Sequence, residues 1–326
     1  MSVGAAEVVP GAAGAGLLEP LGEIAARSPW QLFWRRFRRD RVALVSLVFI
    51  VFLVFIAIFA PLVVKLLGLP GPYVQNLSLT DEFGSPLGPS GAHPFGVDQL
   101  GHDIMSRVIY GTRVSLQVGI LGTAIATVIG TAFGIVAGYY RGAVDTLLAR
   151  IVDVVLSIPI LLLGLGIGAG CAVRGCLGGA VNPGVGAIIF LILLVTWTYI
   201  FRVVRGLVLS LREREFVEAS RALGASNVRI MFREILPNLV GPIIVYATLL
   251  IPLNILLEAS LSFLGLGVQE PTAAWGLMLR GAAVEFAETA PWMAIFPGLA
   301  ISLAVFAFNL FGDSLRDALD PRLRNR

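Results

Sequence analysis

Charged residues are scarce in this chain. Asp, Glu, Lys and Arg make up 14% of its 326 residues, whereas a soluble domain usually has about 25%. Hydrophobic residues make up 57%. This composition argues against an ordinary soluble domain and indicates that lipid is the solvent for much of the protein.

Lysine is almost absent: the chain has 23 arginines and one lysine, Lys65. A phosphate-binding P-loop needs the pattern G-x-x-x-x-G-K-[ST]. The sequence around Lys65, APLVVKLLG, does not fit it. We therefore expect no ATP hydrolysis through such a loop in this chain. The excess of arginine, with many Ala and Gly residues, is typical of a GC-rich, bacterial genome.

Catalytic motifs are missing as well. The sequence has two histidines, no H-E-x-x-H pair and no G-x-S-x-G elbow. Four side chains in HPFGVDQLGHD are able to ligate a metal: His93, Asp98, His102 and Asp103. A turn-rich loop explains them more simply, because metal sites need tight ligand geometry and supporting partners. The sequence predicts no metal site and no enzyme activity of the chain by itself.

Long apolar runs are abundant instead. Six of them are long enough to cross a bilayer, which takes roughly 20 apolar residues: 42–64, 114–140, 154–173, 185–201, 239–257 and 290–312. Lipid offers no hydrogen-bond partners, so each run must satisfy its backbone internally as a helix. The predicted fold class is an all-α, polytopic membrane protein with six transmembrane helices.

The positive charges predict an orientation, since Lys and Arg accumulate on the cytoplasmic side. If both termini are cytoplasmic, 19 of the 24 lie inside and five lie outside: Lys65, Arg107, Arg113, Arg174 and Arg280. These residues sit beside spans rather than in a soluble basic patch, so we expect no nucleic acid partner.

The runs divide the chain into segments. We expect a disordered cytoplasmic tail over 1–27, a first span over 42–64, an external segment over 65–113, a core over 114–313 and a cytoplasmic tail over 314–326. In SPWQLFWRRFRRDR, residues 28–41, aromatic residues at helical spacing lie beside arginines. This pattern favours an interfacial helix on the anionic inner leaflet. The alternative is a stop signal of arginines with incidental aromatics.

The chain has only two cysteines, Cys171 and Cys176, in CAVRGC. By the predicted orientation they lie on the outer side, where disulfides persist. We expect a disulfide between them. The alternative is two buried thiols at a helix end.

A charged segment interrupts the apolar runs. Residues 215–238, EFVEASRALGASNVRIMFREILPN, carry three arginines and three glutamates. Phe216, Ala219 and Leu223 share one helical face. Gly224 suits a left-handed helix end, Ser226 an N-cap of a second short helix, and Pro237 the start of the next helix. The small residues favour a cytoplasmic hairpin that another protein approaches closely, over a solvated connector.

This hairpin resembles a known motif. EAS at 218–220, Gly224 and ILP at 235–237 resemble the EAA loop of ABC-importer permeases, E-A-A, three residues, G, nine residues, I-x-L-P. Ser220 replaces the second Ala, and Glu234 stands where Ile is usual. HPFGVDQLGHDIMSRVIYGTRVSLQVG (93–119) and EASLSFLGLGVQEPTAAWG (258–276) are similar to the C-type permeases of the dipeptide, oligopeptide and nickel subfamily. The resemblance covers roughly residues 30–322.

The resemblance implies a type I importer fold in a bacterial inner membrane. A homologous permease would complete the pathway, an external binding protein would deliver the substrate, and two cytoplasmic ATPases would bind ATP and Mg²⁺, leaving no cofactor on this chain. The EAA loop, within 206–237, would dock on an ATPase through Glu218, Ala219, Ser220, Gly224, Leu236 and Pro237. Peptides are the expected substrate, with nickel chelates, haem or another small solute as alternatives.

Two questions stay open at this point. Glu258 lies at the outer end of the fifth run, where it either bonds another helix or lines the pathway. Other classes of protein are also conceivable. A secondary transporter usually shows inverted repeats and ionisable residues at the bilayer midplane, neither of which is evident. A purely structural membrane subunit is the remaining alternative.

Overall fold

The computed structural model describes residues 29–81, 85–171, 175, 179–286 and 288–319. The predicted 1–27 tail lies outside them. Within them the chain is helical, with only two isolated β-bridges. The elements are α1 (Pro29–Phe37), α2 (Arg41–Leu66), η1 (Leu77–Leu79), α3 (Ile104–Tyr140), α4 (Gly142–Ser157), α5 (Ile160–Cys171), α6 (Val185–Leu211), α7 (Glu215–Ala222), α8 (Asn227–Arg229), η3 (Ile230–Ile235), α9 (Leu236–Phe263), α10 (Trp275–Glu285) and α11 (Trp292–Leu319).

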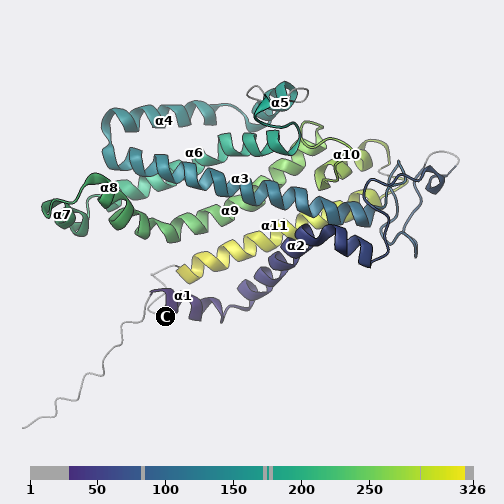
Figure 1. Ribbon diagram of the computed structural model, residues 1–326, viewed down its shortest axis with the longest axis horizontal. Helices are drawn as coiled ribbons and strands as arrows, with labels where there is room; N and C mark the ends of the chain where they lie inside the picture. Colours follow the sequence, from purple (N-terminus) through teal and green to yellow (C-terminus); the bar gives the residue numbers. More distant parts are fainter. Residues whose placement is uncertain (1–28, 82–84, 172–174, 176–178, 287, 320–326) are drawn as a thin grey trace, which may run out of the picture.

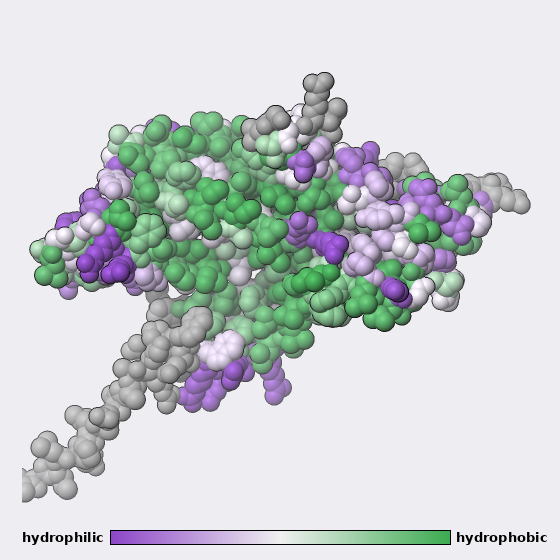
Figure 2. Space-filling view, viewed as in Figure 1, coloured by the Kyte–Doolittle hydropathy of each residue, from purple (hydrophilic) through white to green (hydrophobic). Residues whose placement is uncertain are grey.

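Five helices are long and apolar enough to cross a membrane: Arg41–Leu66, Ile104–Tyr140, Val185–Leu211, Asn227–Phe263 and Trp292–Leu319. The all-α membrane fold is thus confirmed. The long helices run side by side (Figure 1), and hydrophobic residues form a band across them (Figure 2). One end of the molecule carries α7 and α8, the hairpin end. The opposite end carries residues 67–103 and α10, the loop end.

The run 154–173 is not the straight span that the sequence predicted. It begins within α4 and continues through α5, and these two helices meet at an angle of 85°, so together they form at most one broken span. The cause is Pro159, which lacks a backbone N–H and disfavours a helical conformation at the preceding residue. Ile158 is accordingly extended, with φ −87° and ψ 124°.

Several helices reach beyond their apolar runs. α3 begins at Ile104 rather than near 114, because the side chain of Asp103 caps it by accepting a hydrogen bond from Ser106 N. The predicted external segment 65–113 therefore ends in helix. α6 continues to Leu211, inside the predicted 206–237 loop, and α11 continues to Leu319, inside the predicted tail.

Close packing of α3 on α6 depends on glycines spaced four residues apart: Gly130, Gly134 and Gly138. A Cβ atom on Gly130 would lie 2.6 Å from the carbonyl oxygen of Trp197, and one on Gly138 would lie 3.0 Å from that of Arg205. Small residues at this spacing let the backbones of membrane helices approach one another. The stripe joins the two helices from their middle to the hairpin end.

The remaining helices enclose separate apolar clusters. Residues of α2, α3, α9, α10 and α11 share one of these, which includes Ile255 and Phe308. Phe33 and Phe37 anchor α1 against α11, where the rings of Phe37 and Phe311 meet edge to face with their centroids 6.1 Å apart. The aromatic residues of the predicted interfacial helix are thus partly used for packing within the chain.

Candidate coupling site and the loop-end polar cluster

The turn of the hairpin follows α7. Gly224 has φ +79°, the left-handed conformation predicted for it. Its N–H donates to Arg221 O at 3.0 Å, and the N–H of Ala225 donates to Ser220 O at 3.0 Å. This pair of bonds closes the last turn of a helix around a left-handed residue. A Cβ atom at Gly224 would meet nothing within 4 Å, so the glycine is needed for backbone conformation rather than for space.

The segment after the turn differs from the prediction. Ser226 caps the chain as expected, accepting from Arg229 N at 3.4 Å. However, no new helix starts at Pro237, since residues Asn227–Phe263 form one continuous helix. A π-helical segment, η3, precedes the proline, and Leu236 N–H bonds to Met231 O five residues back. This wider turn carries the helix into Pro237, whose missing N–H would leave a gap in a regular helix.

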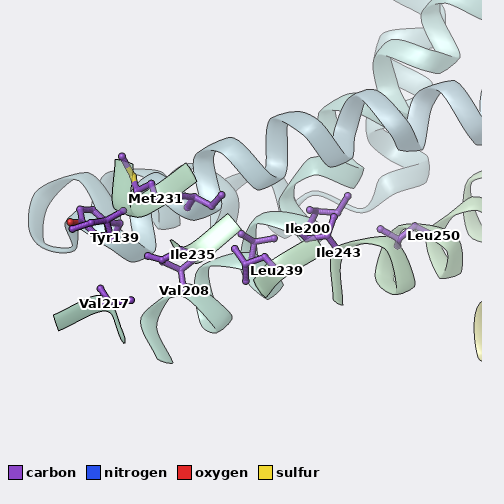
Figure 3. Close-up of a cluster of buried hydrophobic side chains, with 12 residues drawn as sticks. Tyr139, Ile200, Val208, Val217, Met231, Ile235, Leu239, Ile243 and Leu250 are labelled. Atoms are coloured by element: carbon purple, nitrogen blue, oxygen red, sulfur yellow. The ribbon is translucent and has the colours of Figure 1, made fainter. Parts of the chain in front are cut away.

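The base of the hairpin, formed by Val217, Ile230 and Ile235, packs against the membrane-spanning helices. Val217 of α7 and Ile230 and Ile235 of η3 are each 0% exposed. They share an apolar cluster with Tyr139 of α3 and Val208 of α6 (Figure 3). Polar contacts reinforce it, because the Tyr139 hydroxyl donates to Asn227 Oδ1 at 2.8 Å. The base of the hairpin is therefore packed against α3, α6 and α9.

The tip of the hairpin is open. Leu223 is 89% exposed, Phe232 61% and Val228 58%. The predicted apolar face of Phe216, Ala219 and Leu223 is exposed. The side chain that packs α7 against the spans is Val217, which the sequence pattern did not indicate. Periodicity alone does not say which of two neighbouring faces packs inward.

The six predicted docking residues lie in two groups. Glu218, Ala219 and Gly224 are exposed around the turn, with Ser220 half-buried beside them. Leu236, half-buried, and Pro237, exposed, lie beyond η3 at the start of α9. Their role in docking is not tested by the geometry and stays a proposal.

Glu258 of α9 is 0% exposed. The hydroxyl of Ser115 in α3 donates to its carboxylate at 2.9 Å, and that of Ser262 donates at 2.8 Å. Ser262 Oγ in turn accepts from Val268 N–H at 3.2 Å. The carboxylate thus links α3, α9 and the segment after α9.

The four potential metal ligands at the loop end are paired two by two. His93 Nδ1 lies 2.9 Å from Asp103 Oδ2, and His102 Nδ1 lies 2.9 Å from Asp98 Oδ2. Across the described ranges, no three His, Cys, Asp or Glu side chains converge as metal ligands. Arg107, 1% exposed, completes the cluster through two hydrogen bonds to Glu270, at 2.8 and 2.9 Å.

Asp98 titrates below its usual range. Burial alone would raise its pKa, but the hydrogen bond to the His102 side chain, the charge of Arg107 and the backbone N–H of His102 together outweigh burial and lower the pKa. The cluster therefore keeps an ionised carboxylate beside a buried guanidinium, which ties residues 98–102 to α3.

Cys171 is the last residue of α5 and is 2% exposed. Cys176 lies outside the described residues. The predicted disulfide stays a prediction.

These features define a class of protein. A polytopic helical membrane chain without a P-loop, with a hairpin seated on its spans, has the architecture of an importer permease. A solved structure titled as an inward-facing MetNI methionine ABC transporter supports this fold: it matches with a TM-score of 0.54 over 67% of this chain and 98% of the solved chain, at 19% identity. A second crystal form matches with a TM-score of 0.55.

Sequence relatives specify the family. Residues 130–325 match the family described as "Binding-protein-dependent transport system inner membrane component", and residues 28–84 match the "N-terminal TM domain of oligopeptide transport permease C". The chain is 40% identical to the dipeptide transport system permease protein DppC of Alkalihalophilus pseudofirmus, over 94% of each chain. It is 42% identical to the glutathione transport system permease protein GsiD of Pectobacterium atrosepticum, over 92% of this chain and 94% of that one.

The chain belongs to the permease family of bacterial ABC importers, in the branch that carries the oligopeptide-permease-C N-terminal domain. It is a non-catalytic, multi-pass membrane subunit, and ATP is handled by partner ATPases.

Proposed function

We propose that this permease imports di- and oligopeptides, and that residues 215–238 couple it to a cytoplasmic ATPase. The observation that carries the coupling proposal is the contrast within the hairpin. Its base is buried against α3, α6 and α9, whereas its tip presents Leu223, Val228 and Phe232 to solvent. Exposed apolar side chains gathered on one small structure are typical of a protein contact.

The coupling would work as a shift between two states. The ATPases change shape with nucleotide, and the hairpin carries that change to the spans through Val217 and the Tyr139–Asn227 hydrogen bond. Nucleotide at one end and substrate at the other would bias one inward–outward equilibrium. The side chain of Glu218 has no hydrogen-bond or ion-pair partner among the described residues, which leaves its carboxylate for the ATPase or for solvent.

The proposed assembly follows from the family. A homologous permease would form the pathway with this chain, two ATPases would bind the two hairpins, and a binding protein would deliver solute outside. The excess of arginines at the hairpin end supports cytoplasmic termini. Residues 67–103, at the loop end, would then face the binding protein.

Peptides are the proposed cargo because relatives are named for dipeptide and for glutathione transport. Both cargoes carry amide bonds between amino acids. Nickel chelates, haem and other small solutes are the alternatives, and a competition assay separates them.

The decisive experiment uses vesicles that contain this chain with its partner permease and ATPases, and a peptide-loaded binding protein. Gly224→Val places a branched side chain at φ +79°, which costs about 1–2 kcal/mol. Glu218→Lys reverses a charge at the proposed contact. Both variants should insert normally, yet lose ATPase co-purification and ATP-driven peptide uptake.

Gly206→Ala is the matched control, because this exposed glycine of α6 has open space around it. Parental binding and uptake in both hairpin variants would reject the coupling proposal. Parental coupling with no peptide uptake, but uptake of a competitor solute, would reject only the choice of cargo.

A further inference from the structure

Arginines crowd the junction between α1 and α2. Residues 35–41 carry five arginines and one aspartate, which gives this short segment a net charge of +4. Four of the arginines are exposed and form no ion pair with any described residue, and we name them the α1 arginine cluster: Arg35, Arg38, Arg39 and Arg41. Positive charges so close together repel one another. The cluster is therefore a basic surface on which an anion would be stabilising.

The nearby acids do not neutralise this cluster. Asp40, the one acid in the segment, caps α2 by accepting a hydrogen bond from Val42 N–H at 2.8 Å. Asp313 and Asp317 are exposed on the neighbouring helix α11, and neither forms an ion pair among the described residues. The charge of the cluster is thus open to an anion from another molecule.

Apolar packing fixes the place of the cluster on the surface. Phe33 and Phe37 of α1 are 9% and 3% exposed and pack against Leu315 and Ala318 near the end of α11. Residues four apart lie on one face of a helix, so Trp34 shares the neighbouring face of α1 with an arginine of the cluster. The packing of α1 on α11 therefore turns this face away from the bundle.

Trp34 marks the depth of this face. Its side chain is 46% exposed, and the Cζ atom of Arg38 lies 5.0 Å from the centroid of its ring, within the range of a cation–π contact. Exposed tryptophans concentrate at the level of lipid headgroups, because the ring is apolar and its N–H is polar. Trp34 beside the cluster therefore indicates a surface that lies among headgroups.

Apolar surface begins within one helical turn of the cluster. Val45 and Val48 of α2 are 69% and 68% exposed. Val45 lies four residues beyond Arg41, which is about 6 Å along a helix. The hydrophilic patch at α1 lies directly beside the hydrophobic surface of the spans (Figure 2). A molecule that satisfies both surfaces has an anionic head and an apolar tail, which describes an anionic phospholipid rather than free phosphate.

We propose that the α1 arginine cluster and Trp34 bind the headgroup of an anionic phospholipid, in the leaflet that meets the hairpin end of the molecule. The planar fork of a guanidinium donates two hydrogen bonds to the oxygens of one phosphate. The bound lipid tethers α1 to the membrane surface and, through Phe33 and Phe37, tethers the end of α11 as well. This inference goes beyond the proposed transport function and depends neither on the cargo nor on the hairpin.

Lipid titration of the assembled transporter tests the proposal. The complex of this chain with its partner permease and ATPases, purified in an uncharged detergent, receives phosphatidylglycerol or phosphatidylcholine with the same acyl chains. Phosphatidylglycerol should raise the unfolding midpoint further than phosphatidylcholine does, because a ligand that binds only the folded state stabilises it. High salt should reduce this difference, since it screens exposed charges.

A pair of charge variants locates the site. Arg38→Gln combined with Arg39→Gln should weaken phosphatidylglycerol binding about thirtyfold, which corresponds to roughly 1 kcal/mol for each arginine. Mass spectrometry of the intact complex measures the bound lipid. Arg150→Gln combined with Arg280→Gln is the matched control, because both arginines are exposed, form no ion pair among the described residues and lie on α4 and α10. The control should keep the parental affinity.

Three results would overturn the proposal. The first is parental phosphatidylglycerol affinity in the Arg38 and Arg39 variant. The second is an equal rise of the unfolding midpoint with inorganic phosphate, which would assign the cluster to a free anion. The third is loss of the ATPases or of the partner permease from that variant at parental lipid affinity, which would make the cluster a protein contact.

Discussion

Arg107 of α3 forms two hydrogen bonds to Glu270, 163 residues further along the chain, at 2.8 and 2.9 Å. Its other terminal nitrogen lies 2.9 Å from His102 Nδ1 and 3.6 Å from Asp98. One guanidinium thus joins three parts of the loop end: residues 98–102, the start of α3 and the segment between α9 and α10.

Arg107→Ala should destabilise the chain by about 2–3 kcal/mol. Breaking a buried ion pair costs roughly 3–5 kcal/mol, and the value is reduced here because the Glu270 side chain is 48% exposed to solvent. Thermal unfolding in detergent measures the effect. Arg280→Ala is the control, since Arg280 is exposed and has no ion pair among the described residues. Equal midpoints for the two variants would contradict the assigned role of Arg107.

The same cluster predicts a dependence on acid pH. The folded-state pKa of Asp98 is lowered from the ordinary value of 3.8, so the unfolded chain binds the proton more readily. Stability from this group is therefore fully present above pH 3.8 and is lost as pH falls through the lower folded pKa. Asp98→Asn should flatten the fall of the unfolding midpoint below about pH 4. Asp317→Asn, at an exposed site on α11, should keep the parental slope; a parental slope in Asp98→Asn would be evidence against this assignment.

The glycine stripe gives a matched pair of helix variants. A Cβ atom on Gly134 would lie 2.8 Å from Val204 Cβ and 3.1 Å from Phe201 O, whereas one on Gly206 would meet nothing within 4 Å. Gly134→Ala should destabilise by about 1–3 kcal/mol through overpacking. Gly206→Ala should be neutral or stabilising by up to about 1 kcal/mol, because alanine is the better helix former. If Gly134→Ala unfolds at the parental temperature, α3 and α6 do not depend on this close approach.

Much of this architecture was accessible from the sequence, because 57% of the residues are hydrophobic and the long runs mark the spans. The features that the sequence did not predict were missed for separate reasons. The bend at Pro159 had a visible signal in SIPILL, which the run length concealed. The early start of α3 has a signal in Asp103. The sequence predicts Arg107 as a charge on the outer side and carries no sign of its burial. Its burial depends on Glu270, a long-range partner that no local pattern reveals.

Glu258 should act in structure rather than in the passage. Its carboxylate accepts from two hydroxyls, and one of these, Ser262, already accepts from Val268 N–H. Glu258→Gln replaces one acceptor oxygen with a donor, so that Ser115 or Ser262 must turn its hydroxyl to accept and lose its present hydrogen bond, at a cost of about 1–3 kcal/mol. The unfolding midpoint should fall, while uptake per folded transporter stays parental. A changed KM for peptide at parental stability would instead place Glu258 in the passage.

The hairpin offers a pair of variants with opposite readouts. Leu223 is 89% exposed at the tip, and Val217 is 0% exposed at the base, six residues away on the same short segment. Leu223→Asp should leave the unfolding midpoint of the isolated chain unchanged, because surface substitutions usually stay within about 0.5 kcal/mol. It should weaken ATPase binding by roughly 2 kcal/mol, as expected for an apolar anchor buried in an interface.

Val217→Ala should instead lower the stability of the isolated chain, by about 1–2 kcal/mol, through lost packing on Tyr139 and Val208. Titration of purified ATPase onto the reconstituted permease, alongside thermal unfolding, separates the two effects. Parental ATPase affinity in Leu223→Asp would mean that the exposed tip is not the ATPase contact. The packing of the hairpin base on α3 and α6 would then need an explanation other than coupling to an ATPase.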